Sequence, residues 1–133
     1  MRILPILAAT SGLVIASGLM ARPAEAELPP HVYQQARDSA GTVVTLRVES
    51  VRRLPTGETQ GDCTLTGIIT SVDRGRAREG QTVVVPVPCI SPAWQPMPGP
   101  FPGYRHDVLG RAETVRVYMT GGVLVRRGLD ILD

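Results

Sequence analysis

The sequence predicts a small, mainly β protein: a five-stranded antiparallel barrel with a short N-terminal helix and one disulfide. Three observations lead to this fold class. Residues 42–54 alternate apolar and polar side chains, as a half-buried strand does. Residues 61–91 contain two β-type runs around a charged turn, and the only two cysteines, Cys63 and Cys89, lie near the outer ends of these runs. Glycine and proline separate the runs along the chain, which is typical of turns between strands.

Residues 1–26 are predicted to be a signal peptide. Arg2 is followed by an apolar segment, residues 3–21, and then by an Ala-Glu-Ala site of the kind that signal peptidase cleaves. We therefore expect cleavage after Ala26, a periplasmic or secreted mature chain of residues 27–133, and no stable membrane span after cleavage. The alternative is that the apolar segment remains as an uncleaved membrane anchor.

Residues 27–41 are predicted to form a helical segment. Pro30 suits the first turn of a helix, and Gly41 suits the position just past its end. Between them an apolar stripe recurs every four residues, with Tyr33 beside it. The members of this stripe are Val32, Ala36 and Ala40. A helix this short is marginal alone, so we expect it to cap one end of the sheet.

Residues 42–133 are predicted to be a single β-barrel domain. In the first strand, the alternation fails after Ser50, where a bulge near Ser50 and Val51 would bend the strand. The turn-forming residues 55–62 then lead into the central hairpin. The last hairpin pairs residues 113–119 with a strand that starts at residue 123, with a bend at Gly128 and with Arg127 on the apolar side at the rim.

The central hairpin carries the predicted disulfide. Folding it about Arg76 places Cys63 opposite Cys89 and puts a set of apolar residues on the same face. The other pairs on this face are Leu65 with Val87, Gly67 with Val85, and Ile69 with Val83. A slip of one residue would separate the cysteines onto different faces. In an oxidising compartment such a pair forms a disulfide, which stabilises the fold by roughly 3.5 kcal/mol in the chain-entropy model.

A proline-rich loop, residues 90–111, interrupts the strands. Five prolines fall between residues 92 and 102, which excludes a helix or a central strand there. The loop also holds Trp94, Phe101 and Tyr104, three of the five aromatic residues of the chain. It is either a recognition element that presents these rings or a lid in which Trp94 fills the open end of the barrel. We expect Trp94 to be partly buried and the other two rings to lie nearer the surface.

The glycine and valine spacing of the central hairpin resembles that of known small barrels. Gly67, Val72 and Gly75, followed by Gly80, Val83 and Val85, are similar to the second and third strands of OB-fold barrels and to the netrin-like barrels of secreted metalloprotease inhibitors. The resemblance covers residues 42–89 and implies a closed five-stranded barrel. Netrin-like inhibitors approach the protease metal with an N-terminal cysteine. This chain has Glu27 at its predicted mature start, so that route of inhibition is not expected.

Charge argues against nucleic acid as a partner. The chain has 14 basic residues, all arginine, and 12 acidic ones. Removing residues 1–26 takes away Arg2, Arg22 and Glu25, which leaves 12 arginines against 11 acids. The predicted strands carry a single aromatic residue, Tyr118, and thus no stacking platform.

The sequence offers little to catalysis or to cofactors. It has no nucleophile-elbow motif and no phosphate-binding glycine loop, so an enzyme is not expected. His106 and Asp107 are adjacent, so their side chains point apart, and we interpret His106 as a solvated loop histidine. No cofactor is expected. The alternative is a periplasmic metal-binding protein or metal-dependent enzyme that uses His106 with Met97 or Met119.

We therefore expect an exported, non-catalytic and monomeric binding module of the bacterial envelope. Its partner would be an envelope protein or an anionic ligand of unknown identity. Two groups of residues could bind it: the loop aromatics Trp94, Phe101 and Tyr104, and the arginines of the hairpin tip, Arg74, Arg76 and Arg78. For the arginines, the alternative is a solvated surface balanced by nearby acids.

Overall fold

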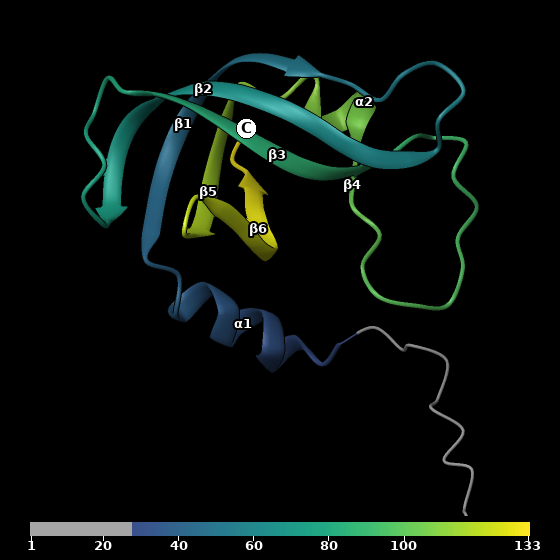
Figure 1. Cartoon of the computed structure of the whole chain (residues 1–133), viewed down its shortest axis with the longest axis horizontal. Helices are drawn as coiled ribbons and strands as arrows, with labels where there is room; N and C mark the ends of the chain where they lie inside the picture. Colours follow the sequence, from purple (N-terminus) through teal and green to yellow (C-terminus); the bar gives the residue numbers. More distant parts are fainter. Residues whose placement is uncertain (1–27) are drawn as a thin grey trace, which may run out of the picture.

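A single strongly curled sheet forms the body of the protein. The structure, a computed structural model, describes residues 28–133. Along the chain the elements are α1 (Pro30–Asp38), β1 (Thr42–Arg52), β2 (Gln60–Arg74), β3 (Thr82–Ile90), β4 (Tyr104–Arg105), α2 (His106–Leu109), β5 (Thr114–Thr120) and β6 (Val123–Ile131). Figure 1 shows β2 and β3 crossing over β1, β5 and β6, with α1 packed below the strands. The predicted signal peptide lies outside the described residues.

The sheet has six strands and is mixed, so the prediction of five antiparallel strands is corrected. The strand order is β4-β3-β2-β1-β5-β6, and β4 runs parallel to β3 while the other neighbours are antiparallel. A two-residue strand has no periodicity, which is why the sequence analysis included β4 in the loop. The helix α2 was not predicted for the same reason, because its four residues are too few to show a periodicity.

The barrel is half formed rather than closed. β3 comes close to β6 but does not pair with it. We call this gap between β3 and β6 the seam. Two prolines of β3, Pro86 and Pro88, explain why no strand continues the sheet there. Proline has no N–H and is tolerated only where that group would point away from a neighbouring strand, so these two residues leave the free edge of β3 short of donors.

The central hairpin confirms the predicted disulfide and faces, but its register is shifted by two residues. Cys63 lies opposite Val87, and Cys89 lies opposite Gly61. The two cysteines are diagonal neighbours whose Cα atoms are 5.8 Å apart, and they are bonded to each other. Because side chains repeat every two residues, this shift keeps every predicted apolar residue on the buried face. The cysteines and the apolar residues beside them form the core.

The other expected elements are present with small displacements. The helix spans Pro30–Asp38, with proline in its first turn as predicted. The pairing of β1 with β2 shifts register at three places, and the last of them, between Val48 and Ser50, lies just before the predicted bulge. In the last hairpin the pairing jumps from Val117 opposite Leu129 to Met119 opposite Leu124, which leaves extra residues on β6. This bulge contains the predicted bend at Gly128, where a Cβ would lie 2.7 Å from the carbonyl oxygen of Val125.

Candidate functional site

Arg127 contacts two aromatic rings, those of Tyr33 and Phe101, at the surface of the molecule. The β6 bulge gives it a positive φ of 50°, which is unusual for a residue other than glycine and turns its side chain out of the strand alternation. Its guanidinium carbon is 4.6 Å from the ring centroid of Tyr33 on one side and 4.7 Å from that of Phe101 on the other. Arg127 therefore joins helix α1, strand β6 and the proline-rich loop through two cation–π contacts.

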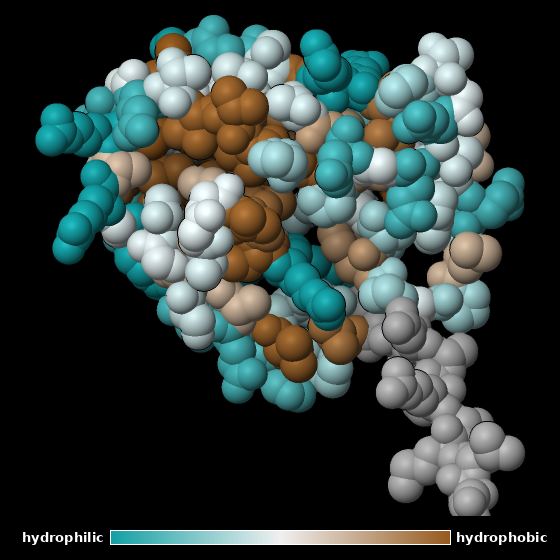
Figure 2. Space-filling view, in the orientation of Figure 1, coloured by the Kyte–Doolittle hydropathy of each residue, from teal (hydrophilic) through white to brown (hydrophobic). Residues whose placement is uncertain are grey.

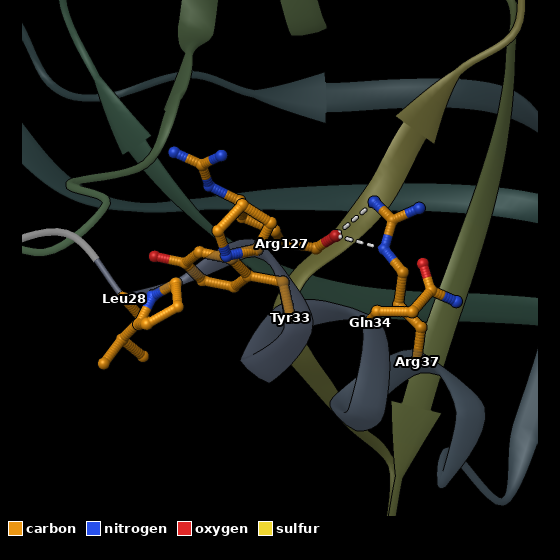
Figure 3. A pocket seen from close by; sticks show the side chains of 7 residues that line it. Leu28, Tyr33, Gln34, Arg37 and Arg127 are labelled. Atoms are coloured by element: carbon orange, nitrogen blue, oxygen red, sulfur yellow. Dashed lines mark hydrogen bonds between the residues drawn. The ribbon is translucent and has the colours of Figure 1, made fainter.

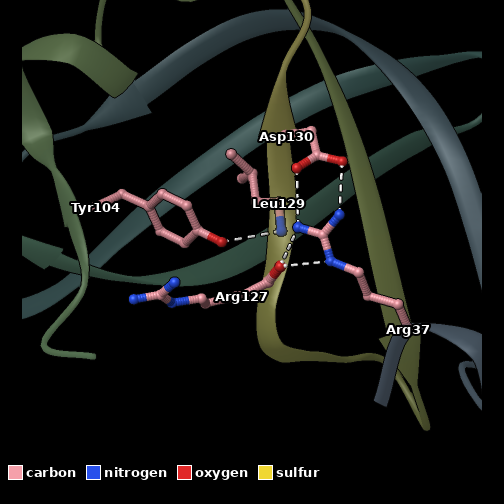
Figure 4. Close-up of polar contacts among 5 residues, drawn as sticks. All are labelled: Arg37, Tyr104, Arg127, Leu129 and Asp130. Atoms are coloured by element: carbon pink, nitrogen blue, oxygen red, sulfur yellow. Dashed lines mark hydrogen bonds and ion pairs between the residues drawn. The ribbon is translucent and has the colours of Figure 1, made fainter. Parts of the chain in front are cut away.

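A salt bridge fixes α1 beside this stack. Arg37 donates from its two terminal nitrogens to the two carboxylate oxygens of Asp130, at 2.9 and 2.8 Å, as Figure 4 shows. It also donates to the carbonyl oxygen of Arg127, from Nε at 2.9 Å and from a terminal nitrogen. The hydrogen bond with Asp130 is the main reason that the pKa of Arg37 is raised above its ordinary value. The helix is thus attached to β6 by charge-assisted hydrogen bonds from Arg37 to the Asp130 carboxylate and to the Arg127 carbonyl oxygen.

Tyr104 holds the end of the loop against the same strand. Its hydroxyl accepts a hydrogen bond of 3.0 Å from the backbone N–H of Leu129, so the loop contacts both sides of the seam (Figure 4). Burial raises the pKa of Tyr104, and the hydrogen bond from Leu129 opposes that rise. The rings of Phe101 and Tyr104 meet edge to face, with their centroids 5.0 Å apart. These contacts close the seam with side chains where backbone pairing is absent.

Two clefts open on either side of the Tyr33–Arg127 pair. The larger, which we call the α1 cleft, has a volume of about 570 Å³ and appears in Figure 3. Its lining is Leu28, Pro29, Pro30, Tyr33, Gln34, Arg37 and Arg127. The smaller, which we call the seam cleft, has a volume of about 300 Å³. Its lining is Tyr33, Pro88, Pro100, Phe101, Leu124, Val125, Arg126 and Arg127. Because both linings include Tyr33 and Arg127, the clefts meet at that pair.

The lining of both clefts is apolar with positive charge added. Among the described residues that line them, three are arginines and none is acidic. Arg37 is balanced by Asp130, and Arg126 and Arg127 are the other two arginines of the linings. In Figure 2, hydrophobic residues gather over the crossing strands, and the surface is hollowed between the strands and the proline-rich loop. Such a surface suits a ligand with apolar parts and negative charge.

The predicted aromatic residues have three different positions. Phe101 is half-buried and stacks on Arg127, so it lies in the seam cleft. Tyr104 packs against the core, which corrects the expectation that its ring lies nearer the surface. Trp94 is half-buried, as expected, and its backbone N–H donates to the carbonyl of Ser91 at 3.0 Å. Trp94 lines neither cleft.

The predicted arginines of the hairpin tip have different environments. Arg74 donates at 2.8 to 3.1 Å to the carbonyl oxygens of Arg37, Asp38 and Ala40, so it caps the C-terminal end of α1. Arg76 and Arg78 are exposed on the turn between β2 and β3 and line neither cleft. The tip therefore contains one structural arginine and two solvated ones.

The residues of the predicted metal alternative have unrelated environments. His106 begins α2, and its Nδ1 accepts a 3.2 Å hydrogen bond from the backbone N–H of Leu54, so it is not the solvated histidine that we expected. Met97 is 69% exposed on the loop, whereas Met119 is 6% exposed in the core. Within residues 28–133, no three His, Cys, Asp or Glu side chains cluster as a metal site requires.

Sequence reasoning missed Tyr33 and Arg37 as site residues, and it placed Arg127 at the rim of the sheet without pairing it with an aromatic ring. Tyr33 was noted only as a neighbour of the helical stripe, yet it is 7% exposed and forms the wall between the clefts. Arg127 gave one available signal: an arginine on the apolar side of a strand next to a glycine. That combination indicates a bulge that turns the charged side chain toward solvent.

Comparisons place no known protein beside this chain. No family model, no curated protein and no solved structure matches it. Among residues 28–133, none of the helices combines the length and the apolar character needed to cross a membrane.

Proposed function

We propose that this protein is an exported, non-catalytic binding module of the cell envelope. It receives an apolar, negatively charged part of its partner in the clefts around Tyr33 and Arg127. The observation that carries the proposal is the composition of the two clefts. Rigid proline and aromatic side chains contribute to their walls, and among the described residues of the lining arginine supplies the only charge. Rigid side chains lose little entropy on binding, which favours an interface over a solvated surface.

The disulfide supports the proposed location. A bond between Cys63 and Cys89 persists in an oxidising compartment, where the predicted signal peptide would deliver the mature chain. The proposed role also accounts for the side-chain closure of the seam. Phe101 and Tyr104 keep the cleft walls fixed while the neighbouring loop, residues 91–103, passes over the surface.

Charge reversal at the cleft tests the proposal. The mature protein is isolated from its native compartment, immobilised, and exposed to detergent-solubilised envelope from the same cells. The variant Arg126→Glu changes an exposed residue of the seam cleft without removing any contact of the core. We expect it to weaken retention of the partner at least about tenfold, which corresponds to about 1.4 kcal/mol.

The matched control is Arg76→Glu, which makes the same charge change on the hairpin tip. Retention should be unchanged in this variant. Loss of binding in Arg76→Glu with normal binding in Arg126→Glu would move the site to the tip and contradict the proposal. Chemical conversion of the captured partner would contradict the non-catalytic assignment.

A further inference from the structure

The hydroxyl group of Tyr33 is a buried donor without a hydrogen bond. Tyr33 is 7% exposed, and among residues 28–133 no atom pairs with its hydroxyl. Buried tyrosine hydroxyls normally have a partner, because an unsatisfied polar group destabilises the fold. Figure 3 shows the ring standing in the α1 cleft with its hydroxyl on the side of Leu28. The cleft therefore contains a donor that a ligand acceptor can satisfy.

The N-terminal end of α1 faces the same cleft and is uncapped. Pro29 occupies the N-cap position and makes no side-chain hydrogen bond to the helix, and the first turn holds no acidic residue. Pro29 and Pro30 both line the α1 cleft. The positive end of the helix dipole is thus left without the negative side chain that commonly accompanies it. An anion bound here would meet both the dipole and the Tyr33 hydroxyl.

The remaining lining selects the kind of anion. Leu28, Pro29 and Pro30 supply apolar walls, and the Arg37 charge is already engaged by Asp130. The Tyr33 hydroxyl and the helix end, with the Arg127 guanidinium stacked on the Tyr33 ring in the same lining, suit a single negative charge on an apolar body. We propose that the α1 cleft binds the carboxylate of such a ligand, with the Tyr33 hydroxyl donating to a carboxylate oxygen. This inference rests on the proposed function and names the ligand chemistry of one of its two clefts.

A matched pair of small probes tests the proposal on the mature protein. Phenylacetate and phenylacetamide have the same shape, but only the first is charged. Each is titrated into ¹⁵N-labelled protein while backbone amide resonances are followed by NMR. We expect phenylacetate to shift the resonances of residues 31–34 saturably, with a dissociation constant on the order of 1 mM, as suits a fragment of this size. Phenylacetamide should bind at least about tenfold more weakly, because it lacks the charge.

Two variants isolate the hydroxyl. Tyr33→Phe should weaken phenylacetate binding at least about threefold, while Tyr118→Phe, the control, should leave it unchanged. Without ligand, Tyr33→Phe should keep or raise the urea midpoint, because it removes an unsatisfied polar group. A lower midpoint would show that the hydroxyl has a partner and would overturn the proposal.

Other outcomes also decide the question. Equal binding of both probes, shifts elsewhere in the protein, or no saturable shift would overturn the carboxylate assignment. Inorganic phosphate that shifts residues 31–34 more strongly than phenylacetate would replace the carboxylate with a phosphate group. If the probes fail while Arg126→Glu still abolishes retention of the envelope partner, the proposed function stands and only the ligand chemistry is wrong.

Discussion

Arg37 and Asp130 lie 93 positions apart in the chain, and their side chains meet in a two-point salt bridge between α1 and β6. The same arginine binds the carbonyl oxygen of Arg127, the residue whose guanidinium stacks on Tyr33 and Phe101. One side chain thus fixes the helix, the bulge and the position of the cleft wall.

Replacing Arg37 with glutamine should loosen α1. The change removes the hydrogen bonds to Asp130 and to the bulge, and bonds that involve charged groups contribute about 1.5–3 kcal/mol each when buried. Because Asp130 is partly exposed, we expect a smaller loss of about 1–2 kcal/mol in the free energy of unfolding, measured with urea. Arg47→Gln, which removes an exposed pair with Glu49, should change it by less than about 0.5 kcal/mol. Equal effects of the two variants would contradict the assigned role of Arg37.

Gly103 should not tolerate alanine. Its φ is +140°, and a Cβ there would lie 2.7 Å from the backbone nitrogen of Cys89 and from the carbonyl oxygen of Pro88. The added methyl must push β4 away from β3, because backbone atoms cannot give way. We expect Gly103→Ala to lower the free energy of unfolding by about 2 kcal/mol or more and to expose the amide of Leu129 to hydrogen exchange. Gly80→Ala is the control, since it has a positive φ of 83° but no atom within 4 Å of its Cβ. A loss no larger than that of the control would contradict the tight packing at Gly103.

Tyr104 should make stability fall at high pH. Its pKa is raised above its ordinary value, chiefly by burial, so the folded state holds the phenol proton more tightly than the unfolded state does. The resulting stabilisation is fully present below the unfolded pKa and is lost as pH rises through the folded one. Urea midpoints measured across this alkaline range should therefore drop in the wild type and drop less in Tyr104→Phe. Identical pH profiles for the two proteins would show that Tyr104 is not the group responsible.

The fluorescence of Trp94 should report a partly shielded ring. Trp94 is half-buried and is the only tryptophan, so the native emission belongs to it alone. We expect an emission maximum between those of fully buried and fully exposed tryptophan, and partial quenching by iodide. Trp94→Ala should cost less than the roughly 3–5 kcal/mol that truncation of a fully buried tryptophan costs. A blue-shifted, unquenched emission with a loss of that size would instead make Trp94 the plug of an open barrel end.

The sequence predicted those parts of the fold that depend on local pattern. Alternation placed Leu65 and Val85 on the buried face, and the turn residues separated the strands correctly. The exact register could not be obtained this way, because a shift of two residues preserves every face. The order of the strands, the parallel β4 and the open seam depend on contacts between distant segments, for which a single sequence gives no periodic signal.

The candidate site was predictable only in part, for a related reason. Phe101 was selected as an aromatic residue of the proline-rich loop, and the structure places it in the lining of the seam cleft. Its partners Tyr33 and Arg127 come from opposite ends of the described chain and meet only because the β6 bulge turns Arg127 outward. Arg74 looked like a surface charge, yet it caps α1, because the hairpin tip lies beside the end of that helix. Each error arises where tertiary structure gives a residue a neighbour that its sequence position does not reveal.

The prolines at positions 86 and 88 have a consequence for behaviour in concentrated solution. A sheet with a complete edge can recruit a strand from a second molecule and grow into a fibre, because each added strand offers a new row of donors and acceptors. In this protein the edge of β3 lacks the N–H donors of two alternate residues. A strand from a second molecule that paired with this edge would therefore leave some of its own carbonyls without a partner. The half-formed barrel can therefore leave the backbone edge of β3 unpaired at the seam without becoming a template for cross-β polymerisation.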